Sequence, residues 1–504
     1  MLEHYVKKIL KARVYEIADI VPLDEAVNLS IRTGNQILLK REDLQPVFSF
    51  KLRGAYNKMV QLSQQEKDKG VIAASAGNHA QGVALSANKM DIDAVIVMPK
   101  TTPDIKVDAV KRLGGTVKLH GDSYDEAYQQ AKVIEKEQDR TFIHPYDDPE
   151  VIAGQGTVAM EIMKQCQTEP DAIFVPVGGG GLIAGIAVYV KYLYPNVKII
   201  GVEPDDAASM HDALIANERI ILDQVGIFAD GVAVRQVGEE TFRIAQEYVD
   251  EMILVNADEV CAAIKDIFDD TRTVMEPAGA LAVAGLKKYI KENKVKNQTF
   301  VAVNSGANIN FDRLRHVAER AELGENREVL FSVEIEECPG SFLHFCEIIG
   351  NRGITEFNYR YSHAKIAQIF VGVKTADAEV EKQELFELLI QEKYSIIDLS
   401  DNEIAKLHLR HMVGGHAPTI KNEHLYRFEF PERPGALLRF LSGMGQNWNI
   451  SLFHYRNHGA AFGRVLAGIQ VPDHELEAFH EYLDELAYNY WDETNNPAYK
   501  SFLR

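Results

Sequence analysis

Short apolar runs alternate with stretches of helical period from Gln36 to about Asn310, and this alternation constrains the possible folds more than any other feature of the sequence. The runs are rich in β-branched residues, as buried strands are. Strands that alternate with helices build mostly parallel sheets with helices on both faces, so we expect an α/β fold. Examples are Val71–Ala74, Ala94–Met98, Ala172–Val177, Ile199–Val202 and Phe300–Val303.

Four segments with chemically informative residues begin where predicted strands end, which is where parallel sheets bind ligands. They are Ser49–Ala55, Ser75–Gly82, Gly178–Leu182 and Ser305–Asn308. In the first segment, Lys51 opens a predicted helix in the apolar interior. A desolvated lysine loses its proton more easily and becomes a nucleophile that can form an imine with a carbonyl cofactor. The alternative is a solvated lysine at a helix start, the commoner situation for lysine.

The second and third segments suit an anion. Each precedes a predicted helix, whose free N–H groups and dipole attract negative charge. The glycines 178 to 181 allow backbone amides to approach a phosphate closely. A Walker loop is excluded because no Lys-Ser/Thr pair follows. The alternative for Ser75–Gly82 is an ordinary strand-to-helix turn with Asn78 and His79 as caps.

A nicotinamide-dependent dehydrogenase is the rival from another chemical class. Gly179, Gly181 and Ala184 formally fit the dinucleotide pattern, and Glu203 ends the next predicted strand. That interpretation leaves Lys51 without a role. Glu203 could instead belong to a cation site with its acidic neighbours, but we expect a solvated loop there and no metal site.

Taken together, the four segments resemble the pyridoxal-phosphate enzymes of the tryptophan-synthase-β fold (fold type II), and within them the threonine dehydratases, or threonine ammonia-lyases. The resemblance covers roughly residues 1 to 320 and implies a pyridoxal 5′-phosphate cofactor. In this resemblance Asn78 faces the cofactor ring and Ser305 hydrogen-bonds its nitrogen. The implied cofactor-binding residues are Lys51, Asn78, Gly178, Gly179, Gly180, Gly181, Leu182 and Ser305. The implied substrate-binding residues are Ser75, Ala76, Gly77, Asn78 and His79.

The resemblance also implies the reaction, which is β-elimination of water from L-threonine to give 2-oxobutanoate and ammonia, the first committed step of isoleucine synthesis. Lys51 would be the catalytic residue, and its freed amine would take the Cα proton as general base. Racemases of this family carry a second serine where this chain has Ala76, which favours elimination over racemisation. The alternatives are L-serine as the main substrate and an amino-acid sensor whose large domain has lost activity.

The last third of the chain contains an internal repeat. Phe331–Ile335 and Tyr426–Phe430 are similar, and each precedes a Pro-Gly pair, at Pro339 and at Pro434. Similarity at a fixed offset indicates one folding unit used twice. Each copy predicts the order strand, turn, helix, two strands, helix, strand, which is an α+β ferredoxin-like unit.

The repeat resembles the ACT-like regulatory domain, which binds amino acids at paired interfaces; the alternative is a packing module without a ligand. We therefore expect a catalytic domain at 1–322 and ACT-like units at 327–402 and 423–497. The resemblance implies inhibition by isoleucine, activation by valine and a homotetramer. Allostery would then be a coupling free energy of a few kcal/mol between these units and the Lys51 site.

Length and charge limit the remaining possibilities. A chain of 504 residues is too long for one core. A net charge of −20 argues against nucleic acid and anionic membranes as partners. No apolar run reaches membrane-spanning length, and we expect a cytoplasmic protein. The four cysteines lack metal-binding spacing, so we expect buried thiols in a reducing compartment.

Overall fold

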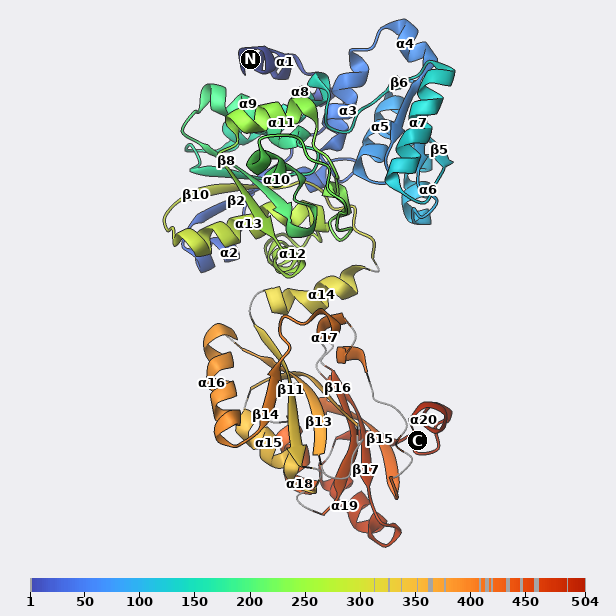
Figure 1. Cartoon of the computed structure of the whole chain (residues 1–504), viewed down its shortest axis with the longest axis vertical. Coiled ribbons are helices and arrows are strands. Elements are labelled where there is room, and N and C mark those ends of the chain that lie inside the picture. Colours follow the sequence, from blue (N-terminus) through green and yellow to red (C-terminus); the bar gives the residue numbers. More distant parts are fainter. Residues whose placement is uncertain are drawn as a thin grey trace. The chain divides into compact units, whose positions relative to one another are not determined.

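The computed structural model forms two compact units, Met1–Ala321 and Glu322–Arg504 (Figure 1). We refer to them as the N-terminal and C-terminal units and describe each by itself. The residues that the structure describes are 2–311, 313–324, 327–336, 338–350, 352–360, 366–375, 378–407, 409–412, 417, 420–431, 436–444, 447–456, 462–486 and 488–503.

The larger sheet of the N-terminal unit has six strands in the order β1-β2-β10-β7-β8-β9. All neighbours pair in parallel except β1, which is antiparallel to β2. The mainly parallel sheet that the alternation predicts is therefore confirmed. The strands are β1 (Leu23–Glu25), β2 (Gln36–Arg41), β7 (Ala172–Pro176), β8 (Lys198–Pro204), β9 (Glu251–Val255) and β10 (Thr299–Asn304).

The two faces of this sheet bury separate cores, because successive side chains of a strand point to opposite faces. In β7, Ile173 and Val175 belong to one core, and Ala172 and Phe174 belong to the other. Helices α1, α8, α9 and α11 contribute to the first core, and α2, α12 and α13 to the second. Their bounds are α1 (Leu2–Lys11), α2 (Val27–Thr33), α8 (Pro149–Gln165), α9 (Gly181–Leu193), α11 (Glu239–Tyr248), α12 (Ala257–Thr271) and α13 (Pro277–Asn293).

A second, four-stranded parallel sheet completes the N-terminal unit, in the order β5-β4-β3-β6. Helices α3, α5 and α6 share a core with one of its faces, and α7 covers the other. The elements are α3 (Lys51–Val60), α4 (Gln64–Lys69), β3 (Val71–Ala74), α5 (Asn78–Lys89), β4 (Ala94–Met98), α6 (Asp104–Arg112), β5 (Thr116–Leu119), α7 (Tyr124–Gln138) and β6 (Thr141–Phe142). The remaining α-helix is α10 (Ser209–Ala216), and α14 (Arg313–Gly324) spans the boundary with the C-terminal unit.

The C-terminal unit contains the predicted repeat, but its two copies share one antiparallel sheet of eight strands, in the order β14-β11-β13-β12-β16-β17-β15-β18. The copies join where β12 pairs with β16. The first copy comprises β11 (Glu328–Glu336), α15 (Ser341–Ile349), β12 (Ile354–Arg360), β13 (Ile366–Lys374), α16 (Ala378–Gln391) and β14 (Ser395–Asp398). The second comprises β15 (Glu423–Pro431), α18 (Ala436–Met444), β16 (Asn449–Arg456), β17 (Phe462–Gln470), α19 (Leu476–Leu486) and β18 (Asn489–Asp492).

The predicted order of elements in each repeat is confirmed, and each copy also adds a short helix, α17 (Glu403–Leu407) or α20 (Pro497–Phe502). One continuous core lies between the sheet and helices α15, α16, α18 and α19. Smaller clusters that include residues of α17 and α20 use the opposite sheet residues. Glu337 and the turn segment 432–435, with its Pro434, lie outside the described residues.

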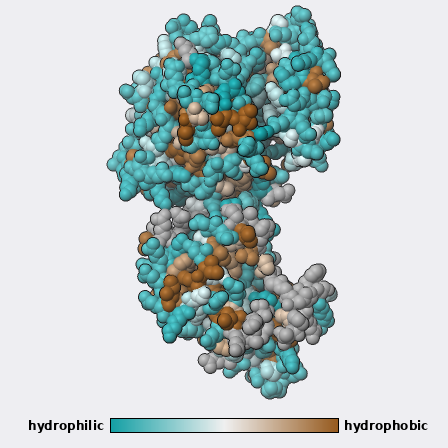
Figure 2. Space-filling view, in the orientation of Figure 1, coloured by the Kyte–Doolittle hydropathy of each residue, from teal (hydrophilic) through white to brown (hydrophobic). Residues whose placement is uncertain are grey.

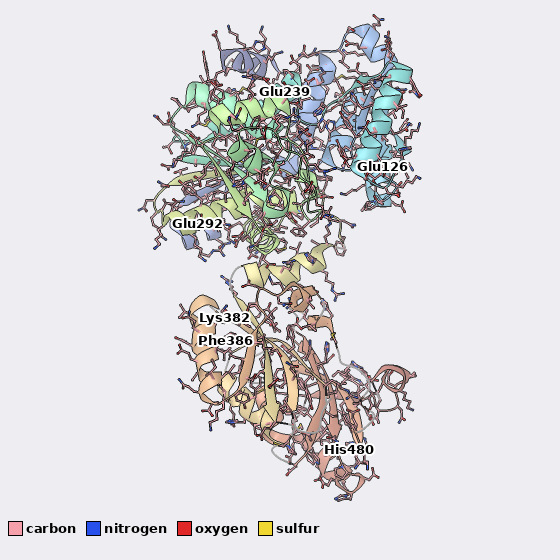
Figure 3. The ribbon with its side chains drawn as sticks, in the orientation of Figure 1. Glu126, Glu239, Glu292, Lys382, Phe386 and His480 are labelled. Atoms are coloured by element: carbon pink, nitrogen blue, oxygen red, sulfur yellow. The ribbon has the colours of Figure 1, made fainter. Side chains whose placement is uncertain are left out.

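Side chains on α7 and α16 make contacts that fix the start of one helix and the packing of the other (Figure 3). On α7, Glu126 forms a reciprocal capping box with Ser123, which satisfies N–H groups at the helix start. On α16, Lys382 donates to Asp398 of β14 at 2.9 Å, while Phe386, one turn later, packs against the core. Residues four apart lie on the same side of a helix, so this side of α16 contacts both β14 and the core.

The surface is mainly hydrophilic on the face shown, with hydrophobic residues in separate patches (Figure 2). Across the described residues, no helix combines the length and apolar character that crossing a membrane requires. The cysteine prediction is partly wrong: Cys261 and Cys346 are buried, but Cys338 is exposed because it lies in the turn before α15.

Candidate functional site

Three of the four segments meet at the carboxyl edge of the larger sheet. Strands β2, β10 and β7 are parallel neighbours, so the residues after them reach the same edge. Ser305 and Gly178 follow β10 and β7 closely, and the loop after β2 leads to Lys51. A bridge joins Ser49 to Gly306, and the Phe50 N–H donates to the Ser305 carbonyl at 3.3 Å. The Lys51 segment is therefore attached directly to the Ser305 segment.

The fourth segment reaches this place from the smaller sheet. Ser75 follows β3, and Asn78 opens α5. The Asn308 amide donates to the Asn78 oxygen at 2.6 Å, and the Asn78 amide donates to Glu276 at 2.5 Å. These two bonds fix the orientation of Asn78, and they place residues of both sheets in one site.

The Lys51 side chain has the environment of a reactive amine. Lys51 is the first residue of α3 and is half-buried. Its Nζ donates to the Pro145 carbonyl at 3.1 Å and lies 5.3 Å from the Phe50 ring centroid. Burial lowers the Lys51 pKa to about 8, against an opposing effect of the Glu276 carboxylate. These contacts favour a partly desolvated amine over a solvated lysine at the helix start.

The loop before α5 leaves open space on one side. A Cβ added to Gly77 would meet nothing within 4 Å. The Gly77 N–H donates to Ser75 Oγ at 3.2 Å. His79, in contrast, is buried, its Nε2 lies 2.8 Å from the Ile143 carbonyl oxygen, and burial lowers its pKa to about 3. A neutral His79 ring cannot supply positive charge to a carboxylate, so this loop offers an anion only N–H and hydroxyl groups.

The four-glycine loop fits a phosphate. A Cβ on Gly179 would lie 2.2 Å from the Tyr146 ring, and one on Gly178 would lie 2.9 Å from Val232 Cα. Gly180 has φ +96°, which favours glycine. No acidic residue occupies the first turn of α9, so no side chain there neutralises its N-terminal dipole. Only glycine fits this loop, and its N–H groups suit an oxyanion.

Ser305 is buried beside these groups. Its Oγ donates to the Ala278 carbonyl at 3.3 Å, a long bond that a better acceptor could replace. The preceding Asn304 amide is buried, and neither its Nδ2 nor its Oδ1 has a hydrogen-bond partner among the described residues. Such unsatisfied polar groups are costly, which indicates a site where a polar ligand belongs.

The environment of Glu203 shows that the predicted solvated loop is wrong and argues against a nicotinamide-dependent dehydrogenase. Glu203 is buried rather than part of a solvated loop, and burial raises its pKa to about 8. Its carboxyl oxygens accept from the N–H groups of Met210 and His211 at 2.8 Å each, at the start of α10. An acidic residue occupied in this way cannot bind the ribose of a dinucleotide.

Several residues near the site could not be assigned from the sequence. Asn308 belongs to the Ser305–Asn308 segment but had no role of its own, and Glu276 lies outside the four segments. Their contacts with Asn78 join parts of the chain more than 190 residues apart. Nothing in the sequence marked Pro145 or Tyr146. Pro145 contributes a backbone carbonyl and Tyr146 a ring that lies against Gly179, and both roles depend on tertiary position alone.

The profile of the family described as "Pyridoxal-phosphate dependent enzyme" matches residues 19–306. The profile described as "C-terminal regulatory domain of Threonine dehydratase" matches twice, at residues 319–409 and 414–503. Both profiles agree with the two units of the structure.

Full-length relatives and solved structures are also similar. The biosynthetic L-threonine dehydratases of Pasteurella multocida and Escherichia coli strain K12 are 55% and 53% identical, each over 99% of this chain and 97% of the relative. The processed threonine deaminase isoform 2 of Solanum lycopersicum is 52% identical, with a TM-score of 0.63 over 64% of this chain and 93% of that one. A serine racemase of Dictyostelium discoideum is 31% identical, with a TM-score of 0.56 over 61% and 99%.

Proposed function

The chain belongs to the family of biosynthetic threonine dehydratases, which are pyridoxal-phosphate-dependent lyases, and from this premise we propose which of its residues carry out the reaction. The reaction is the deamination of L-threonine to 2-oxobutanoate and ammonia, a step towards isoleucine. The β-hydroxyl leaves as water, and a water molecule later enters when ammonia is released, so the overall change is loss of ammonia.

Lys51 is the catalytic residue. When bound, pyridoxal phosphate supplies a carbonyl carbon for the amines of Lys51 and substrate, and a ring that accepts the electron pair left at Cα. With the substrate bound, the Lys51 amine would act as the general base that takes the Cα proton. A pKa of about 8 means that a useful fraction of this amine is neutral near physiological pH.

The other site residues bind and orient. The loop of Gly178, Gly179, Gly180, Gly181 and Leu182 would hold the phosphate. Asn78 and Ser305 would hold the ring, and Glu276 and Asn308 keep the Asn78 amide in place. Ser75, Ala76, Gly77 and the backbone of His79 hold the substrate carboxylate, beside the open space at Gly77.

The single observation that carries this proposal is the meeting of all four segments around Lys51. The Phe50–Ser305 bond and the Asn78–Asn308 bond join three of them directly, and the glycine loop follows the strand next to β10. Nucleophile, phosphate cradle and carboxylate loop are what amino-acid deamination with this cofactor requires.

The C-terminal unit is regulatory. We place the boundaries at 1–322, 327–402 and 423–497, with isoleucine as inhibitor, valine as activator and a homotetramer as the active form. The shared sheet supports a coupled response, because a shift in one repeat at β12 must move β16 of the other. A cytoplasmic location is consistent with four free cysteines, since reducing compartments keep thiols unpaired.

The test measures keto-acid release from L-threonine, with and without isoleucine, and compares kcat/KM for L-threonine and L-serine. Lys51→Ala should abolish turnover while threonine still binds, and isoleucine should suppress the unmodified enzyme. Substantial turnover by Lys51→Ala would contradict the role of Lys51. A higher kcat/KM for serine would change the assigned substrate, since one methyl group is worth only about 1–3 kcal/mol in a pocket.

A further inference from the structure

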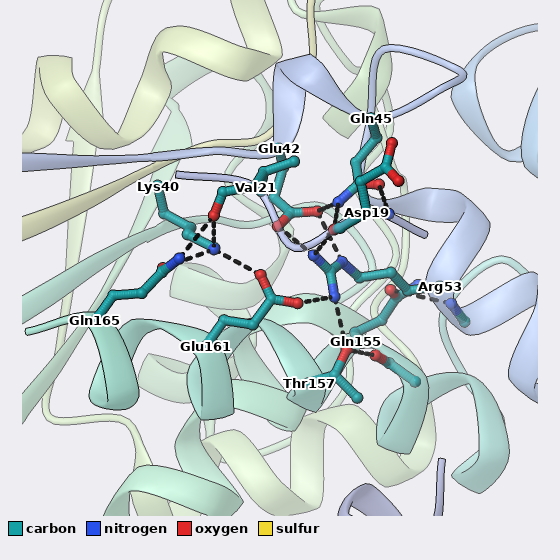
Figure 4. A network of polar contacts seen from close by, with 12 residues as sticks. Asp19, Val21, Lys40, Glu42, Gln45, Arg53, Gln155, Thr157, Glu161 and Gln165 are labelled. Atoms are coloured by element: carbon teal, nitrogen blue, oxygen red, sulfur yellow. Dashed lines mark hydrogen bonds and ion pairs between the residues drawn. The ribbon is translucent and has the colours of Figure 1, made fainter. Parts of the chain in front are cut away.

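Arg53 lies two residues after Lys51, and its side chain is fully buried among charges that the reaction does not use. Its Nε and Nη2 donate to the two carboxylate oxygens of Glu42 at 2.8 Å each, and its Nη1 donates to Glu161 at 2.6 Å (Figure 4). One guanidinium thus holds two buried carboxylates in three directions. We call Arg53, Glu42 and Glu161 the arginine clamp.

A second buried cation, Lys40, balances the negative charge of the arginine clamp. Lys40, also fully buried, donates to the second oxygen of Glu161 at 2.6 Å and to the Val21 carbonyl at 2.7 Å. Two cations and two carboxylates therefore compensate each other's charge in the protein interior. Such a buried network is weak evidence for stability, because packed hydrophobic residues would often stabilise a fold as well. Unlike hydrophobic residues, the network holds its members in fixed directions through hydrogen bonds.

That geometry fixes the start of α3. Glu42 belongs to the short helix Glu42–Leu44 after β2, and Glu161 belongs to α8, so the clamp ties α3 to two other elements. A Cβ on Gly154 of α8 would lie 2.6 Å from the Arg53 carbonyl oxygen. Helices α3 and α8 therefore touch through their backbones where Arg53 is attached.

On its other side, the Lys51 segment is tied to β10. The Phe50 N–H donates to the Ser305 carbonyl, and the Ala307 N–H donates to the Phe48 carbonyl at 2.9 Å. A Cβ on Gly82 of α5 would lie 3.1 Å from the Lys51 carbonyl carbon, so α5 also closes on this turn. The Lys51 backbone is therefore held by β10 and α5 on one side and by α3 on the other. On the α3 side, the buried ion pairs of Arg53 hold it.

We propose that Arg53, through its grip on Glu42 and Glu161, is a positioning residue that sets where the Lys51 amine lies relative to the substrate Cα. This inference rests on the proposed role of Lys51. Proton transfer depends steeply on such placement, and a shift of about 1 Å can cost on the order of 10²-fold in rate. The substrate carboxylate is held elsewhere, by the Ser75–His79 loop, so binding should change little.

The test is Arg53→Lys in the full-length holoenzyme. A lysine keeps the charge but cannot donate in three fixed directions. We expect kcat to fall about 10- to 100-fold while KM changes less than about threefold and the visible absorbance band of the lysine-bound cofactor remains. If Arg53→Lys does not fold, Glu42→Gln carries the same test, because the amide can accept only one of the two bonds; it should show a smaller fall in kcat at unchanged KM.

The matched control is Arg41→Lys. Arg41 is also buried and donates to both oxygens of a buried carboxylate, Asp43, at 3.0 and 2.7 Å. It lies on β2, and its side-chain hydrogen-bond partners among the described residues, Asp24, Asp43 and Thr273, all lie outside α3. It should keep kcat within about threefold of the unmodified enzyme. Unmodified kcat in Arg53→Lys, or equal losses of kcat in both arginine variants, would overturn the proposal. If Lys51→Ala is inactive and Arg53→Lys is fully active, only this inference fails; an active Lys51→Ala removes the proposed function itself.

Discussion

The lowered pKa of Lys51 predicts its reactivity in the cofactor-free enzyme. At pH 7 an amine with a pKa of about 8 is neutral in about one molecule in ten. An ordinary lysine, with a pKa of about 10.4, is neutral in only about four molecules in ten thousand. Only the neutral amine is a nucleophile. At pH 7, Lys51 should therefore react about 250-fold faster than the same amine with an ordinary lysine pKa.

The assay is competitive labelling with a limiting amount of an amine-selective acylating reagent, followed by peptide mass spectrometry across a pH series. The exposed Lys118 in the same digest serves as the reference. Labelling of Lys51 should rise with a midpoint near pH 8. In Glu276→Gln the midpoint should fall further, because the Glu276 carboxylate raises the Lys51 pKa and the amide still accepts from Asn78. A Lys51 profile parallel to that of Lys118, or a midpoint near 10, would refute the argument from burial.

Three further predictions test other parts of the structure. Gly77→Ala should leave the stability of the N-terminal unit unchanged, because its Cβ meets nothing, but should raise KM for threonine about tenfold if the open space receives substrate; an unchanged KM would place the substrate elsewhere. Gly154→Ala should lower the free energy of unfolding by about 1–3 kcal/mol, since its Cβ would lie 2.6 and 2.7 Å from the Arg53 oxygen and Gly54 Cα; urea unfolding followed by circular dichroism measures this, with Gly77→Ala as control. Arg360→Met should destabilise the C-terminal unit by about 3–5 kcal/mol, because it leaves Glu423 buried without the ion pair that spans the two repeats at 2.5 Å. The two tryptophans, Trp448 and Trp491, both lie in that unit, so tryptophan fluorescence reports its unfolding, and a loss under 1 kcal/mol would show that Glu423 is satisfied without the pair.

Most strands of the N-terminal unit could be predicted because their apolar, β-branched runs are local signals. The loops at Ser75, Gly178 and Ser305 were recognisable because glycine and polar residues interrupt those runs where ligands bind. Glu203 was predicted wrongly for a physical reason. A glutamate followed by two aspartates resembles a solvated loop, and only the arrival of the α10 N-terminus gives its carboxyl buried N–H donors.

The sequence alone determined the order of strands and helices, the duplication in the last third, and the positions of Lys51 and of three polar, glycine-containing loops after predicted strands. Each of these depends on neighbours along the chain. Tertiary structure decided that β2, β10 and β7 lie side by side, that the repeats share one sheet, and that Glu276 and Asn308 hold Asn78. It also decided that Arg53 anchors α3 between Glu42 and Glu161. Such contacts join distant residues, and their energies depend on burial, which only the folded chain provides.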